Sequence, residues 1–225
     1  MAQKQALEEA EKYKNWRQKL ETNQVKIRSV DEKYTKRTQD GKVLYALVEV
    51  EAETPEGTKL PPVCMLKGHA VSMLVVLIDE ETEEKSVLLV RQRRICDGSE
   101  TYEHPAGMID EGEEPIEVAA RELKEETGLV VTTGELRELF PKGLYSATST
   151  SDEALFFFYT ERRMSAREIQ ALHNRPTGEE SENEHTHLYV TSFPEAQRLV
   201  SNLHGVLGHL LYLKIVQDYK TLEQV

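Results

Sequence analysis

Three glutamates close together in one short segment are the residues of this chain best suited to bind a metal ion. Glu125 and Glu126 follow Glu122 by three and four positions, so in a helix the three side chains share one face. Like charges at this spacing repel each other and destabilise an isolated helix. A bound divalent cation would offset that repulsion. We expect Mg²⁺, which prefers oxygen ligands and is commonly held by a few carboxylates, with Mn²⁺ as the alternative.

The residues around these glutamates predict a helix between two loops. Pro115 suits a first helical turn, where its missing N–H costs nothing, and Gly128 can take the left-handed conformation that ends a helix. We therefore expect a helix from about Pro115 to about Thr127. Gly107 lies in the preceding segment, where the backbone must turn tightly and could present the Ala106 carbonyl to a metal ion.

These residues belong to a longer pattern. Gly107 is followed after five residues by Glu113, and after seven more by the run Arg121-Glu122-Leu123-Lys124-Glu125-Glu126-Thr127-Gly128-Leu129. The whole pattern resembles a complete Nudix box. Fixed identities at fixed spacing of this kind would arise by chance at a given start on the order of once in 10⁸. We therefore favour this interpretation over a solvated acidic helix face. The resemblance implies hydrolysis of a nucleoside diphosphate linked to a second group, and it leaves that group open.

The chemistry that the resemblance implies needs a metal ion. The oxygens of a pyrophosphate repel a nucleophile, so divalent cations must neutralise their charge and orient water for in-line displacement. Glu122 and Glu126, one helical turn apart, are the first candidates for metal ligands. Glu125 is the third candidate ligand and also a candidate catalytic carboxylate. The Ala106 carbonyl completes the expected ligand set.

The other motif residues of the box are expected to have structural roles. By resemblance to the family, Arg121 has a structural role and pairs with Glu125 or Glu113, which holds the loop against the helix. Gly107 and Gly128 serve the backbone turns on either side of that helix.

Two segments before the box carry a further motif. Glu103-His104-Pro105-Ala106 leads into Gly107, and Arg91-Gln92-Arg93-Arg94 lies ahead of Glu103. Together they resemble the ADP-ribose and ADP-sugar pyrophosphatase branch of the family. The match spans roughly residues 70 to 220. In that branch an arginine contacts the substrate, which suits a rigid planar donor facing phosphate. Arg94 is the first candidate for substrate binding, with Arg93 and Glu103 beside it, and a merely solvated basic cluster is the alternative.

A polar loop after the box resembles the one from which these enzymes bring a glutamate to the attacking water. It contains Glu182-Asn183-Glu184, ahead of an expected strand. A loop carboxylate over a closed site can act as a general base. Glu184 is the first candidate and Glu182 the second, while Glu179 and Glu180 compete in the same acidic loop. Solvated loop acids are the alternative interpretation.

One departure from the branch leaves the terminal sugar open. Where the branch often has a Ser-Pro-Gly turn before a Ser-Asp-Glu segment, this chain has Ala147-Thr148-Ser149-Thr150 before Ser151-Asp152-Glu153. A rigid turn positions a substrate differently from a Ser/Thr run. Tyr145 in the same stretch could stack on a base, although a core position is the more ordinary one for a tyrosine.

Composition and charge limit the partners. The chain has 225 residues with 28 basic and 40 acidic side chains, for a net charge of −12. This balance argues against nonspecific binding of nucleic acid or of anionic membranes. There is no apolar run of about 18 residues to span a membrane, and the first residues lack the apolar core of a secretory signal. We expect a cytoplasmic protein whose partner is a small nucleoside diphosphate sugar.

Periodicity and turn residues predict alternating strands and helices. The expected elements, in chain order, are a helix over 3–24, strands near 25–37 and over 43–54, a hairpin of strands over 70–78 and 86–91, the helix over 115–127, strands over 136–146 and 154–160, a loop over 174–184, a strand over 186–192 and one long helix over 194–219.

These elements predict an α/β protein with two parts. Residues 63–225 are expected to form the Nudix catalytic domain, an α/β/α sandwich with a mixed sheet, as the resemblance implies. Residues 1–62 are expected to add an N-terminal helix and antiparallel strands. Because such extensions exchange between subunits in ADP-sugar pyrophosphatases, we also expect a homodimer.

Three functions remain open from the sequence. The leading one is Mg²⁺-dependent hydrolysis of an ADP-sugar, ADP-ribose first, to AMP and a sugar phosphate. The second keeps this chemistry but acts on UDP-glucose, a dinucleoside polyphosphate or an oxidised nucleotide. The third is a nucleotide-sugar binding module with weak catalysis, which the complete set of helix carboxylates disfavours.

Overall fold

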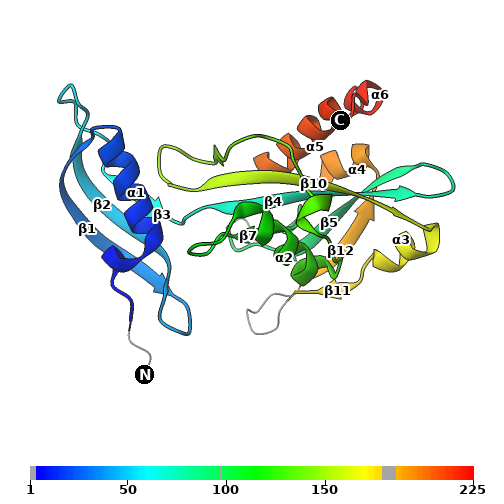
Figure 1. The fold of residues 1–225 in the computed structure, drawn as a ribbon, viewed down its shortest axis with the longest axis horizontal. Helices are drawn as coiled ribbons and strands as arrows, with labels where there is room; N and C mark the ends of the chain where they lie inside the picture. Colours follow the sequence, from blue (N-terminus) through cyan, green and yellow to red (C-terminus); the bar gives the residue numbers. More distant parts are fainter. Residues whose placement is uncertain (1–3, 97, 179–185) are drawn as a thin grey trace. The chain divides into compact units, whose positions relative to one another are not determined.

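The computed structural model describes residues 4–96, 98–178 and 186–225, and these form two compact units (Figure 1). The first unit comprises Met1–His69 together with Leu144–Ala154, and the second comprises Ala70–Gly143 together with Leu155–Val225. The first unit thus contains the N-terminal extension and a segment from the middle of the chain. That residues 1–62 serve dimerisation stays a prediction.

The first unit is a helix packed on a three-stranded sheet. The sheet is antiparallel with the order β1-β2-β3. Val48 and Val50 alternate with exposed Glu49 and Glu51 along the second strand, so one face of the sheet is apolar. The elements of this unit are η1 (Leu7–Glu9), α1 (Glu11–Thr22), β1 (Lys26–Arg37), β2 (Val43–Glu53), β3 (Val63–Leu66) and β9 (Leu144–Tyr145).

The predicted N-terminal helix is interrupted at one residue. Ala10 is extended, with φ −69° and ψ 133°, and separates η1 from α1. The interruption has a packing reason, since Leu7 and Trp16 on either side of it both enter the core of this unit. One continuous helix over 3–24 was therefore wrong, because burial of both side chains outweighed helix propensity.

The second unit is built on a mixed sheet with the strand order β11-β12-β5-β4-β10-β8. The predicted hairpin is confirmed, since β4 and β5 pair antiparallel. In contrast, β4 and β10 run parallel, with Ala70 opposite Leu155. β6 pairs with β5, and β7 pairs with β4. The strands are β4 (Ala70–Asp79), β5 (Lys85–Arg93), β6 (Glu100–Glu103), β7 (Ala106–Met108), β8 (Arg137–Glu138), β10 (Ala154–Met164), β11 (Pro176–Thr177) and β12 (Thr186–Thr191).

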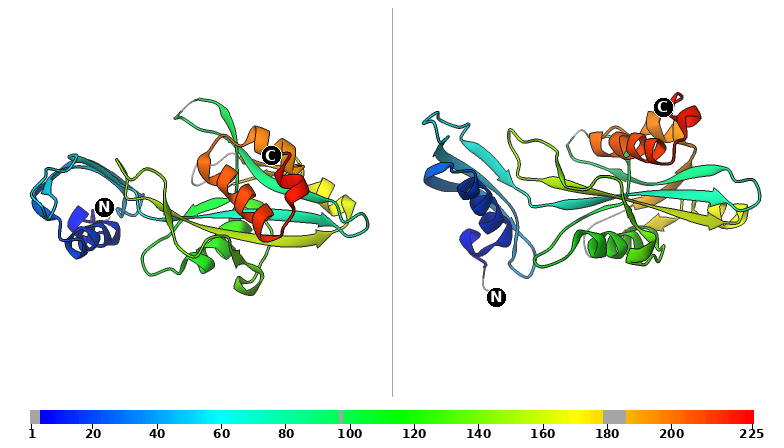
Figure 2. Two further views of the ribbon diagram at one scale, coloured as in Figure 1. Left: turned by 90° about the horizontal axis from the view of Figure 1, so that it is seen from above. Right: turned by 45° about the horizontal axis from the view of Figure 1, so that its top comes forward.

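Helices cover both faces of this sheet, which confirms the predicted α/β/α sandwich with a mixed sheet. α2 (Pro115–Thr127) lies on one face, and α4 (Phe193–Leu199) and α5 (Leu203–Ile215) lie on the other (Figure 2). The remaining helical elements are η2 (Thr133–Glu135), α3 (Ala166–Leu172) and α6 (Tyr219–Leu222).

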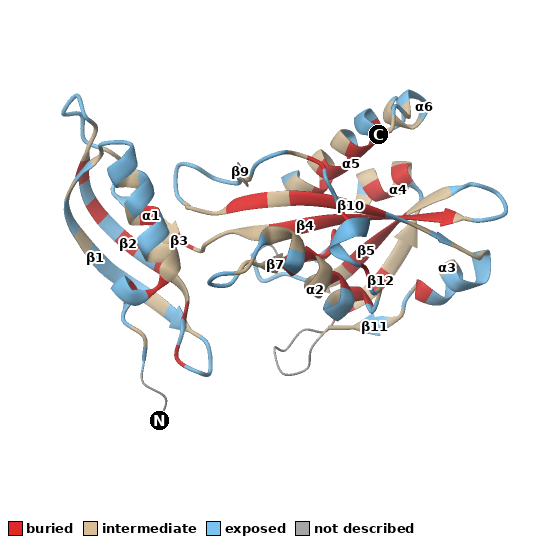
Figure 3. Cartoon of the chain, viewed as in Figure 1, coloured by how far each residue is buried: buried red, intermediate tan, exposed pale blue. Residues whose placement is uncertain are grey.

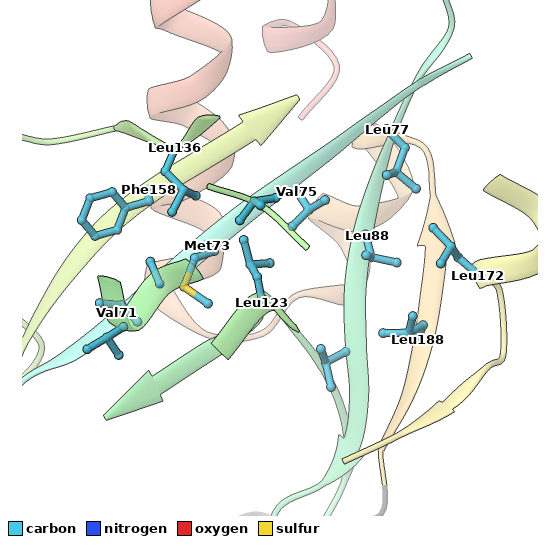
Figure 4. Packing of buried hydrophobic residues seen from close by; sticks show 14 residues of the cluster. Val71, Met73, Val75, Leu77, Leu88, Leu123, Leu136, Phe158, Leu172 and Leu188 are labelled. Atoms are coloured by element: carbon cyan, nitrogen blue, oxygen red, sulfur yellow. The ribbon is translucent and has the colours of Figure 1, made fainter. Parts of the chain in front are cut away.

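The core of the second unit fixes the position of α2. Val71, Met73 and Val75 of β4 are fully buried, as is Leu123 of α2, and Figure 4 shows their side chains packed together. The buried residues form a continuous band along the central strands in Figure 3. Because α2 is held by this apolar side, its polar side faces away from the sheet.

Two further predicted elements were wrong. The long helix over 194–219 is divided into α4, α5 and α6. Val200 is extended, and Asn202 caps α5 by accepting a hydrogen bond at 2.8 Å from the N–H of Gly205. The strand over 136–146 is reduced to β8 and β9, because Pro141 and Gly143 interrupt it.

Candidate active site

The helix of the box begins and ends where the sequence predicts. Pro115 occupies its first turn, and Gly128 ends it with φ +68° while its N–H donates to the Lys124 carbonyl at 2.9 Å. Val118, Ala119, Leu123 and Thr127 are its buried residues. The three glutamates singled out above are less buried than these, which leaves their carboxylates available to polar partners.

Arg121 joins three of the acids of the box. Its Nη1 donates to Glu122 at 2.9 Å and to Glu125 at 3.0 Å, and its Nη2 donates to Glu113 at 3.3 Å. Partial burial lowers the pKa of the guanidinium, but the charges of Glu122, Glu113 and Glu125 outweigh that effect and raise the pKa overall. The predicted alternatives, Glu125 or Glu113, are therefore both partners, and Glu122 is a third.

The loop before the box lies directly on α2. The N–H of Ala106 donates to Glu126 Oε2 at 2.9 Å. A Cβ added to Gly107 would lie 2.0 Å from Cδ of Glu122, so this position requires a residue without a side chain. The structure thus brings together four predicted site residues, Ala106, Gly107, Glu122 and Glu126.

The donor set of this region suits a hard divalent cation. It consists of oxygen atoms alone, from three carboxylates of one helix and the backbone beside them, which is what Mg²⁺ prefers. Within the described ranges, no three His, Cys, Asp or Glu side chains already gather as a metal cage. The reason is visible in the contacts, since Glu122 and Glu125 bond to Arg121 while Glu126 bonds to Ala106. An ion would compete with these partners.

Arg94 and Glu103, both predicted to bind substrate, contact each other. Arg94 donates from Nε at 2.9 Å and from Nη2 at 2.8 Å to the two carboxylate oxygens of Glu103. Thr101 Oγ1 also donates to Glu103, at 2.7 Å. Burial raises the pKa of the Glu103 carboxyl, but the bonds from Arg94 and Thr101 and the charge of Arg94 outweigh it and lower the pKa. Arg93, the next candidate, donates to the Gly98 carbonyl at 2.6 Å.

The candidates for the general base lie outside the described residues. Glu182 and Glu184 belong to the segment 179–185, as do Glu179 and Glu180. Their assignment therefore stays a prediction. Tyr145 is described, and its expected core position was wrong. The side chain is 47% exposed, and its hydroxyl accepts a hydrogen bond from Lys19 at 3.1 Å.

Sequence reasoning missed a buried histidine pair beside the loop. His104 Nε2 lies 2.9 Å from His209 Nε2, and His209 Nδ1 lies 3.0 Å from Gln197 Oε1. His104 is 2% exposed and His209 is fully buried. Burial lowers the pKa of both imidazoles, that of His209 to about 4. A signal was present in the sequence, since Gly208 interrupts the apolar run of a helix next to a histidine.

Comparison with known proteins identifies the family. A NUDIX domain model matches residues 68–201, which is more than half of the chain. The chain belongs to the Nudix family, whose members are hydrolases. The match begins close to β4 and ends after α4, so it includes the box, the loop before it and Arg94.

Individual relatives and a solved structure agree with this assignment. An ADP-ribose pyrophosphatase of Bacillus subtilis (strain 168) is 29% identical over 178 residues, which are 78% of this chain and 86% of that protein. An ADP-sugar pyrophosphatase of Mus musculus is 44% identical over 74 residues, 33% of this chain and 32% of that one. A solved structure described as "Crystal structure of ADP compounds hydrolase" has a TM-score of 0.59 at 19% identity. It covers 87% of this chain and 95% of its own, and it shows the same fold.

Among the described residues, no helix is both long enough and apolar enough to cross a lipid bilayer.

Proposed function

We propose that this Nudix hydrolase cleaves the diphosphate bond of an ADP-sugar, with ADP-ribose as the first candidate, to give AMP and a sugar phosphate. The observation that carries the proposal is the contact of the Ala106-Gly107 loop with Glu122 and Glu126, which gathers oxygen donors on one side of α2. The names of the Bacillus subtilis and Mus musculus relatives support the choice of an ADP-sugar.

The metal ion would be held by residues of the box. We assign Glu122 and Glu126 as its first ligands, Glu125 as the third, and the Ala106 carbonyl as the backbone ligand. When bound, Mg²⁺ or Mn²⁺ neutralises diphosphate charge and activates water. Arg121 bonds to Glu125 of its own helix and to Glu113 of the preceding loop, which limits the movement of these acidic side chains when an ion enters.

Arg94 is the proposed substrate-binding cation. Its two bonds to Glu103 fix the plane of the guanidinium before any ligand arrives. A preoriented planar donor binds a phosphate with less loss of side-chain entropy than a mobile one. Glu103 therefore acts as a positioning residue for Arg94. Arg93 remains the second candidate for binding the substrate.

The proton of the attacking water needs a base. We propose Glu184, with Glu182 as the second candidate, because both belong to the acidic loop between β11 and β12. A carboxylate there would take the proton as the nucleophile attacks one phosphorus, while the other phosphate leaves. Glu125 is the candidate within the box itself.

Two other functions are the alternatives. Hydrolysis of UDP-glucose, a dinucleoside polyphosphate or an oxidised nucleotide would use the same acids with a different recognition of the leaving group. A nucleotide-sugar binding module would need Arg94 but not the three carboxylates of α2.

The first experiment is a substrate panel. Nucleoside diphosphate sugars, dinucleoside polyphosphates and oxidised nucleotides are incubated with Mg²⁺ or Mn²⁺ in water labelled with oxygen-18, and the products are identified by mass spectrometry. AMP and ribose phosphate from ADP-ribose are expected. If the protein cleaves another nucleotide but no ADP-sugar, the ADP-sugar assignment is refuted and the cleaved nucleotide takes its place.

A pair of variants on one helix separates an enzyme from a binder. Glu122→Gln removes a proposed ligand, and Glu117→Gln changes an exposed glutamate of the same helix. We expect Glu122→Gln to retain ADP-ribose affinity and to lose at least about a hundredfold in kcat, as removal of a group acting in the transition state does. Glu117→Gln should have wild-type turnover. Unchanged turnover in Glu122→Gln would refute the metal-ligand assignment.

The predicted homodimer is part of the proposal. Light scattering coupled to size-exclusion chromatography measures it directly, and a monomer at micromolar concentration would remove it. The cytoplasmic location likewise stays a prediction.

A further inference from the structure

The segment Glu103–Gly107 is held by a different contact at each residue. His104 bonds to His209 of α5, the Pro105 carbonyl accepts from the N–H of Met73 at 2.9 Å, and the Ala106 N–H donates to Glu126 of α2. Consecutive backbone residues are covalently fixed at close spacing. Because only Pro105 separates the two residues, a displacement at His104 has few backbone rotations to take it up before it reaches Ala106.

The histidine contact has a defined direction. An amide oxygen only accepts hydrogen bonds, so Gln197 Oε1, at 3.0 Å from His209 Nδ1, places the proton of His209 on Nδ1. Nε2 of His209 is then an acceptor, and His104 donates to it from Nε2 at 2.9 Å. The chain Gln197-His209-His104 joins α4 and α5 to the loop, and each imidazole is held in one tautomer.

Gly208 leaves the space that His104 occupies. A Cβ at Gly208 would lie 2.9 Å from Cε1 and 3.2 Å from Nδ1 of His104. Glycine within a helix is less stable than alanine, so the close approach of the imidazole explains why it is tolerated here. The ring of Phe193 closes a further side of His209, with ring centroids 5.7 Å apart. These contacts leave the two imidazoles little room to move.

We propose that Gly208, His209 and Gln197 are positioning residues that set the place of the Ala106 carbonyl and thereby the affinity for the divalent metal ion. They lie on the face of the sheet opposite α2, which carries the acids (Figure 2). The inference rests on the proposed function, because it concerns the metal site assigned there. The effect reaches that site through His104 and Pro105.

The test measures Mn²⁺ binding to the protein without substrate, by the loss of the free-ion signal in electron paramagnetic resonance. Gly208→Ala adds a methyl group against His104, and His209→Phe keeps an aromatic ring but removes both hydrogen bonds. Loss of a group that orients a metal ligand typically weakens metal affinity about 10- to 100-fold. We expect at least a tenfold increase in the Mn²⁺ dissociation constant for both variants.

Tyr212→Phe is the matched control for a merely structural effect. Tyr212 lies on the same helix, and its hydroxyl donates to Glu161 at 2.5 Å and accepts from Lys85 at 2.8 Å. This variant should lower the melting temperature and leave Mn²⁺ affinity unchanged. A change in Mn²⁺ affinity equal to that of His209→Phe would show that loss of stability alone is responsible, and the inference would fall.

The remaining outcomes separate this inference from the proposed function. If wild-type protein does not bind Mn²⁺, the metal site itself is refuted and this inference with it. If wild-type protein binds and His209→Phe binds equally well, only the inference is refuted. His209→Phe decides the matter if Gly208→Ala does not fold.

Discussion

The Glu122 carboxylate occupies the space that a side chain on Gly107 would fill. The Cβ of an alanine there would lie 2.0 Å from Cδ and 2.3 Å from Oε1 of Glu122. Gly107→Ala must displace either the loop or the carboxylate, since such a contact is far inside van der Waals distance. We expect kcat/KM and Mn²⁺ affinity to fall by about tenfold or more, measured by ADP-ribose hydrolysis and by Mn²⁺ titration.

Gly134→Ala is the control for that change. The nearest atom to a Cβ at Gly134 is Thr132 Oγ1 at 3.8 Å, an ordinary contact. This variant should retain wild-type activity. If Gly107→Ala also does, the close approach of the loop to Glu122 has no role in metal binding.

Removal of Arg121 should make the thermal stability of the protein more dependent on a bound metal ion. The guanidinium pairs with Glu113, Glu122 and Glu125, and without it these acids repel one another. Because the pairs are partly exposed, we expect Arg121→Ala to lose only about 1 kcal/mol without metal. Mg²⁺ should then raise the melting temperature of the variant more than that of the wild type, as measured by calorimetry.

A surface pair provides the comparison for Arg121. Arg198 bonds to Glu195 within one helix, and its side chain is 73% exposed. Arg198→Ala should show the same response to Mg²⁺ as the wild type. An equal response in Arg121→Ala would mean that the ion does not take over the neutralising role of the guanidinium.

Loss of Arg94 should destabilise the protein at neutral pH more than in acid. The folded-state pKa of Glu103 is lowered, so its contribution to stability is present above the unfolded pKa and is lost as pH falls through the folded pKa. Arg94→Ala leaves this nearly buried carboxylate without its ionic partner, at a cost of about 2 kcal/mol at pH 7. Urea unfolding at pH 7 and pH 4 should show the difference from wild type shrinking in acid.

Arg93→Ala is the neighbouring control, because Arg93 bonds to the neutral Gly98 carbonyl. Its effect on stability should be independent of pH between 4 and 7. A pH-independent loss in Arg94→Ala would contradict the assigned ionic role of the Arg94–Glu103 pair.

Burial of His209 should give the free energy of unfolding a second dependence on pH. Its folded pKa is lowered to about 4, below that of an unfolded histidine near 6.5. The unfolded state therefore binds more protons between these values, so the free energy of unfolding falls as pH drops from about 6.5 towards about 4. His104 faces the same ring, and its pKa is also lowered, first by burial and then by the charges of His209 and His204, so His104 adds to the slope.

His209→Phe should flatten that slope. The measurement is the free energy of unfolding in urea at several pH values between 4 and 7.5. An unaltered slope in His209→Phe would assign the acid sensitivity to other groups.

Local rules predicted the helix of the box and the central hairpin. Pro115 and Gly128 act on their own turns, and their effect needs no knowledge of the rest of the fold. The strands of the hairpin are long apolar runs joined by an acidic turn. The Nudix resemblance added the sheet between two helical layers, because the spacing of the acids is specific to that family.

Contacts between residues far apart in the chain could not be predicted from the sequence. Nothing local in residues 194–219 shows that Gly205 must approach the Val200 side chain, where a Cβ would lie 2.5 Å from Cγ1. His104 and His209 belong to different elements, and only the folded sheet brings them together. Arg94 and Glu103 were both selected for substrate binding, but their mutual hydrogen bonds depend on the pairing of β5 with β6.

Because β4 pairs in parallel with β10, the fold of the segment that carries α2 depends on the later part of the chain. Every residue of the box lies between these two strands in sequence, so a fragment that ends before β10 would keep α2 but expose one side of β4. An uncovered strand edge with almost entirely buried, apolar side chains is a template for aggregation. Minimal versions of this enzyme must therefore retain both strands, and a protease cut ahead of β10 should inactivate it by precipitation.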